Sequence, residues 1–122
     1  MKKKSVMFIV LLLLVVWCWA DKPKQGGIEG IWEGVLKTPT IELRIVVKIS
    51  KTGDGRLKAT MDSPDQGAKD IGIDTVTVEK NQLAFEVKIV NGHYEGTVNA
   101  DYSEIDGKWT QGGASFPLLL KH

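Results

Sequence analysis

The chain has 122 residues, which fits one domain, with 16 basic and 15 acidic side chains and a formal net charge of +1. Outside Lys2–Lys4 the two signs are interspersed, which argues against a nucleic-acid-binding surface and against a polybasic membrane-binding one. The single cysteine, Cys18, excludes a disulfide framework within the chain.

Residues 1–20 have the pattern of a secretory signal peptide. Lys2–Lys4 form a basic start, residues 6–20 are an unbroken apolar run, and the chain turns polar at Asp21. The run is shorter than the roughly 20 apolar residues of a membrane-spanning helix. We therefore expect a signal-peptide helix, cleavage after Ala20, and export to the periplasm or the extracellular space.

Two other fates of this segment stay open. An uncleaved signal would anchor the protein in the membrane, and a lipid on Cys18 would do the same, although the bulky Trp17 before it fits lipoprotein processing poorly. Cleavage after Ala20 removes three lysines, leaves 13 basic and 15 acidic side chains, and gives a net charge of −2.

The remaining chain divides into a short leader and one domain. Residues 21–27 contain Pro23 and two glycines and are expected to form a flexible tether. From Ile28 to residue 122 apolar side chains recur with a period of two, which is typical of half-buried strands, so we expect a single β-barrel domain at 28–122. The expected strands are 30–37, 41–50, 57–62, 71–79, 83–90, 94–100, 105–109 and 116–120.

Turn signals separate these strands. Thr52–Gly55 and the Asn91–Gly92 pair are typical of hairpins, and Ser63–Asp70 is expected to be the longest loop. Within 71–79 the apolar set changes phase, which predicts a bulge near Asp74–Thr75.

The fold class that these patterns predict is all-β. About eight antiparallel strands joined in chain order can close into an up-and-down, lipocalin-like barrel, which removes exposed sheet edges. A two-sheet sandwich or a half-open meander is the alternative. An eight-stranded barrel is either filled by side chains or holds one small ligand.

The sequence contains no recognisable catalytic or metal-binding motif. His93 and His122 lack the paired spacing of metal ligands, and no serine lies in a nucleophile motif. The acidic residues cluster at turns, where turn geometry accounts for them. We expect no catalytic residue, no metal and no cofactor; a hydrolase that uses the turn carboxylates is the remote alternative.

Four aromatic residues on the expected inner face are the candidate ligand-binding residues: Trp32, Phe85, Tyr94 and Trp109. They either fill the barrel or line a cavity for a small apolar ligand. The small inner residues Gly34, Ala59, Gly96, Ala100 and Gly107 either offset the large side chains or leave such a cavity.

Three stretches carry a family resemblance: residues 30–36, 61–76 and 107–113. Together they resemble the non-catalytic N-terminal β-domain of secreted bacterial serine hydrolases, whose catalytic domain is α/β-hydrolase-like or β-lactamase-like. Gly30-Ile31-Trp32 alone is similar to the opening of lipocalins. The resemblance implies a free-standing accessory module, with no catalytic residue carried over. The candidate partner-contact residues lie in its loops: Asp62, Ser63, Pro64, Asp65, Gln66 and Gln111.

The expected function is therefore that of an exported, non-catalytic module. It would bind a small apolar ligand or dock on an envelope component or a separately encoded serine hydrolase. A filled barrel that acts only as a protein-interaction domain is the alternative.

Overall fold

The computed structural model describes residues 27–122, and all of them belong to strands, two short 3-10 helices or connections. The predicted signal peptide and nearly all of the predicted tether lie outside the described residues. The strands are β1 (Gly30–Lys37), β2 (Glu42–Lys51), β3 (Leu57–Ser63), β4 (Ala68–Gly72), β5 (Thr75–Glu79), β6 (Gln82–Val87), β7 (Gly92–Val98), β8 (Glu104–Gln111) and β9 (Ala114–Lys121). The 3-10 helices are η2 (Pro64–Gln66) and η3 (Lys88–Val90).

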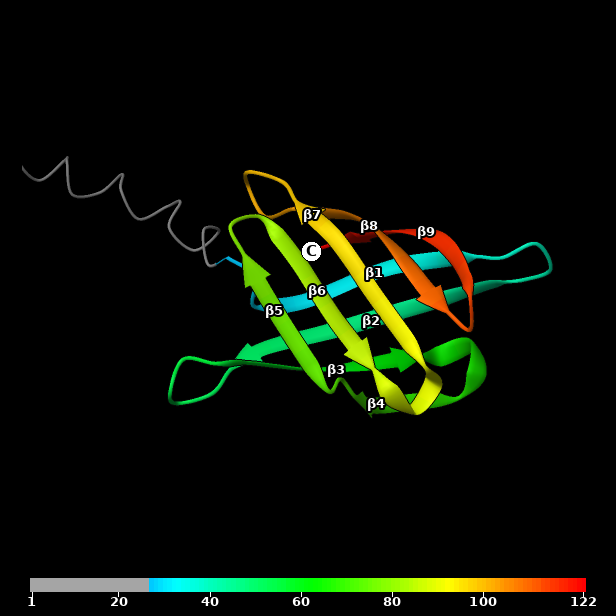
Figure 1. Cartoon of the computed structure of the whole chain (residues 1–122), viewed down its shortest axis with the longest axis horizontal. Coiled ribbons are helices and arrows are strands. Elements are labelled where there is room, and N and C mark those ends of the chain that lie inside the picture. Colours follow the sequence, from blue (N-terminus) through cyan, green and yellow to red (C-terminus); the bar gives the residue numbers. More distant parts are fainter. Residues whose placement is uncertain (1–26) are drawn as a thin grey trace, which may run out of the picture.

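The nine strands form one antiparallel sheet in the order β4-β3-β2-β1-β9-β8-β7-β6-β5. β1 pairs with β9 at Glu33 and Lys121, so the first and the last strand lie side by side in the middle of the sheet. The sheet curls into a half-barrel in which β6 and β7 pass across β1 and β2 (Figure 1). The predicted all-β, antiparallel, up-and-down fold is confirmed, with nine strands in place of about eight.

The ninth strand arises where residues 71–79 change their pairing partner. β4 pairs with β3, and the Ile73 N–H still donates to the Ala59 carbonyl. The Asp74 N–H instead donates to the Glu86 carbonyl, and β5 pairs with β6. The expected single bulged strand is therefore two strands at opposite ends of the sheet, because the phase change marks a change of partner.

Two predicted turns also differ in detail. Asn91 and Gly92 do not form a two-residue turn, because Val87 pairs with Gly92 and η3 fills the connection between β6 and β7. Asn91 adopts φ 55° and ends η3. The predicted loop 63–70 contains η2 and the first residues of β4.

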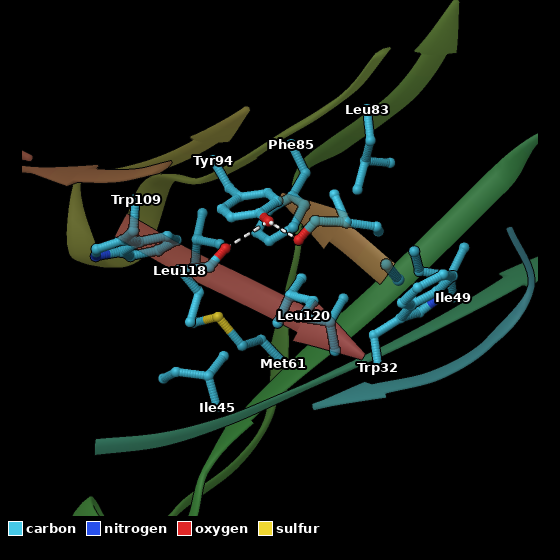
Figure 2. Packing of buried hydrophobic residues seen from close by; sticks show 14 of the residues in the cluster. Trp32, Ile45, Ile49, Met61, Leu83, Phe85, Tyr94, Trp109, Leu118 and Leu120 are labelled. Atoms are coloured by element: carbon cyan, nitrogen blue, oxygen red, sulfur yellow. Dashed lines mark hydrogen bonds between the residues drawn. The ribbon is translucent and has the colours of Figure 1, made fainter. Parts of the chain in front are cut away.

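The core lies inside the curl, between the two halves of the sheet (Figure 2). Alternate residues of each strand point into it, as the period of two predicts. β9 adds Leu118 and Leu120 between the halves, and both side chains are almost fully buried. The core residues are Ile28, Trp32, Leu36, Ile45, Val47, Ile49, Ala59, Met61, Leu83, Phe85, Val87, Tyr94, Val98, Ile105, Trp109, Leu118 and Leu120.

Candidate functional site

The four candidate ligand-binding aromatics lie in the packed interior. Trp32, Phe85, Tyr94 and Trp109 are between 0% and 4% exposed. Phe85 stacks on Tyr94 with ring centroids 5.1 Å apart and lies 6.4 Å from the Trp109 ring. Trp32 is separate from this trio and stacks on His122 at 4.1 Å. Three of the four predicted residues thus form one aromatic cluster, in which the Phe85 ring stacks on Tyr94 and is tilted against Trp109.

The polar atoms of these aromatics are satisfied within the protein. The Tyr94 hydroxyl donates to the Leu118 carbonyl at 2.8 Å, a bond marked by a dashed line in Figure 2. Burial raises the pKa of this hydroxyl, with a smaller contribution from Asp106. The Trp32 indole donates to the Ile28 carbonyl at 2.9 Å. Among residues 27–122, no buried side-chain nitrogen or oxygen lacks a partner. The interior therefore offers no unpaired polar group to orient a ligand.

Glycines make room for the large rings. A Cβ at Gly107 would collide with the Tyr94 ring, and a Cβ at Gly92 would collide with the Trp109 ring. A Cβ at Gly34 would meet the Leu119 carbonyl across the β1–β9 junction. These small residues offset neighbouring bulk, which is one of the two roles that the sequence left open for Gly34 and Gly107. Ala100 lies beyond the end of β7.

The candidate partner-contact residues are engaged with their own domain. Asp65 accepts from the Arg44 backbone N–H at 2.8 Å and pairs with its guanidinium at 2.8 Å. Asp62 accepts from the Asp70 N–H at 2.8 Å and lies 3.3 Å from the Lys48 ammonium. These contacts join the loop after β3 to β2 and β4. The same loop contains three other candidates. Ser63 donates to Gln66 at 2.7 Å, and Pro64, which is exposed, begins η2.

The electrostatics of this loop follow from these contacts. The Arg44 guanidinium and backbone N–H lower the pKa of the Asp65 carboxyl. The Asp70 N–H, followed by the Lys48 ammonium, lowers the pKa of the Asp62 carboxyl despite an opposing effect of burial. Both carboxyls are therefore held ionised, which suits structural anchors and does not suit a general acid. Gln111, the sixth candidate, accepts from the Trp109 indole at 3.0 Å.

An apolar groove on the outer face was not predicted from the sequence. Ile31 and Val35 of β1 and Leu119 of β9 are 54%, 42% and 41% exposed. They line a hollow of about 960 Å³ that also touches Arg44, Val46 and Pro64. The sequence does show apolar residues at outward-facing positions of β1 and β9. The groove forms only because these two strands pair, and they lie far apart in the chain.

The rim of this outer groove is mainly cationic. Lys37, Arg44 and Lys121 line it, with Glu33 as the acidic member. Arg44 is neutralised by Asp65, and Lys121 lies 4.0 Å from Glu104. The groove therefore combines an apolar floor with a rim on which charges of both signs nearly balance.

The two histidines occupy different environments. His93 lies 3.0 Å from Glu95 on the surface, as expected for a solvated residue. His122 contacts two backbone carbonyls: its ring nitrogens lie 2.8 Å from the Tyr102 carbonyl and 2.9 Å from the Glu29 carbonyl. It thereby ties the end of β9 to the entry of β1 and to the β7–β8 turn.

Over the described part of the chain, no three His, Cys, Asp or Glu side chains gather as metal ligands would. Nor does that part contain a helix of the length and apolarity that crossing a membrane takes. Comparisons of the chain with protein-family models, with curated proteins and with solved structures give no match. The resemblance to the β-domain of secreted hydrolases therefore stays a prediction.

Proposed function

We propose that this protein is an exported, non-catalytic binding module that docks on a partner protein through the outer groove of β1, β2 and β9. The observation that carries the proposal is the exposure of Ile31, Val35 and Leu119 in one hollow of the outer face. A hollow with an apolar floor and a polar rim is the kind of surface at which protein partners dock.

The packed interior favours this choice over an internal ligand. Three of the four aromatics that would line a cavity pack together, Trp32 stacks on His122, and glycines lie where the Tyr94 and Trp109 rings need space. Of the two expected functions, the filled barrel acting through its surface is the better supported.

The groove also indicates the chemistry of the partner. An apolar floor with Lys37, Lys121 and Glu33 on its rim complements a protein surface whose apolar side chains are flanked by carboxylates that face the lysines and a basic group that faces the glutamate. A separately encoded serine hydrolase or another envelope protein is the partner that the sequence resemblance suggests. Export rests on residues 1–20, which lie outside the described residues.

Site-specific photocrosslinking in the cells that make the protein tests this proposal. A photoreactive residue at Val35 lies in the groove, and one at Thr97, exposed on β7, is the control on another part of the outer face. We expect a protein adduct of defined mass from position 35 only, and its loss when Lys37→Glu and Lys121→Glu reverse the rim charge.

Three results would refute the docking proposal. They are equal crosslinking from both positions, an adduct that is insensitive to charge reversal, and an adduct that consists of lipid or of a second copy of the chain.

A further inference from the structure

The two end strands of the sheet each have only one hydrogen-bonded neighbour. β4 pairs only with β3, and β5 pairs only with β6. Ile73, in the connection between β4 and β5, donates to the Ala59 carbonyl of β3, but no ladder joins β3 to β5. One edge of each end strand therefore presents backbone N–H and C=O groups without a strand partner, which is the template for adding another strand.

The edge of β4 carries features that discourage strand addition. Lys69 is exposed on it, Asp70 adopts φ 53°, and the ladder to β3 is irregular between Met61 and Ser63. Charged side chains and irregular backbone are the usual means by which proteins keep an edge from pairing.

Apart from the charged Glu79 at its end, β5 carries none of these features within the strand. Its sequence is Thr-Val-Thr-Val-Glu, without lysine, proline or glycine, and its register with β6 is regular from Thr75 to Glu79. Thr75 and Thr77 are exposed, and β-branched residues favour extended backbone. β5 is thus a regular strand with an open edge.

We propose that β5 pairs with β5 of a second copy of this chain, antiparallel and centred on Thr77. In that register Thr77 lies opposite its own copy, Val76 lies opposite Val78, and Thr75 lies opposite Glu79. The pairing ends at the flanking residues, because Asp74 bonds to Glu86 and Lys88 of its own domain and Lys80 adopts φ 59°. No like charges are opposed, and two half-buried valines of each copy meet on the inner face.

The choice of a second copy rests on this self-complementarity. An antiparallel pair about a two-fold axis presents the same segment from both sides, so one sequence must suit both roles. Thr-Val-Thr-Val-Glu meets that condition, because Thr77 faces Thr77, valine faces valine, and Glu79 faces the uncharged Thr75. Five residues form a small interface, so we expect dissociation constants of about 10 µM to 1 mM rather than a permanent dimer.

The test compares lysine substitutions at two positions of the same edge. Sedimentation equilibrium of the protein purified from cells that express the full chain would measure the dimer. Thr77→Lys sets two lysines opposite each other and should abolish dimerisation. Thr75→Lys sets a lysine opposite Glu79 and should preserve or strengthen it. Circular dichroism of each variant checks that the fold is retained.

A cysteine pair tests the register independently. Under mild oxidation Thr77→Cys should form a disulfide-linked dimer much faster than Thr75→Cys, because only position 77 faces its own copy. The wild-type chain controls for linkage through Cys18. A wild-type protein that stays monomeric up to about 1 mM, equal effects of the two lysine variants, or equal crosslinking at positions 75 and 77 would each overturn the proposal.

Discussion

Shortening Phe85 tests whether the interior is packed or hollow. Its side chain is 1% exposed and stacks on Tyr94 at 5.1 Å. Removing a buried phenylalanine to alanine costs about 3–5 kcal/mol, because transfer free energy is lost and a cavity remains. The loss of the aromatic stack is part of that cost and is worth about 0.5–1.5 kcal/mol. Urea unfolding at constant pH, followed by circular dichroism, would measure the change.

A control variant and a milder one keep this prediction testable. Phe116→Ala removes a half-buried ring from β9 and should cost only about 1–2 kcal/mol. If Phe85→Ala does not fold, Phe85→Leu should still show a loss larger than a few tenths of a kcal/mol. A change below about 1 kcal/mol in a folded Phe85→Ala protein would refute close packing, because a ring that lines a hollow gives up few contacts.

Substitutions at three further positions probe the contacts described above. Gly107→Ala should lower the free energy of unfolding by about 1–3 kcal/mol, because its Cβ overlaps the Tyr94 ring; an unchanged thermal midpoint would contradict this packing. His122→Ala should lower it by about 1 kcal/mol in urea unfolding while His122→Phe, which keeps a ring on Trp32, should lose less; equal losses would exclude a role for the stack. Asp62→Asn should reduce stability above about pH 5 and have little effect near pH 2. The pKa of Asp62 is lower in the folded protein than in the unfolded chain, where it is about 3.9. The carboxylate therefore stabilises the fold above the unfolded-state pKa, and this stabilisation is lost as the pH falls through the folded-state pKa. A stability difference between Asp62→Asn and the wild type that does not change with pH would refute this.

Local alternation was sufficient to predict most of the strands. In β2 the inward residues Ile45, Val47 and Ile49 are buried as the period of two requires. The partner change at Ile73–Asp74 was visible only as a change of phase. The partner of a strand depends on the curvature of the whole sheet, and the phase change alone is equally compatible with a bulge.

The two faces of the sheet differed in how well they could be predicted. The inner aromatics were identified correctly as inward-facing, but whether they fill the space depends on pairs such as Tyr94 and Gly107 from different strands. The outer groove was missed, because Val35 and Leu119 are neighbours only through the pairing of β1 with β9. Contacts between distant segments, rather than local pattern, decided both questions.

Native mass spectrometry of the exported protein, purified without refolding, tests the central claim that the interior is filled and the protein acts through its surface. The account predicts the mass of the protein alone, with a second peak at twice that mass at high concentration. A small bound molecule that survives purification in several preparations and is released on denaturation would contradict the account, in which the interior is filled and the outer groove binds a protein.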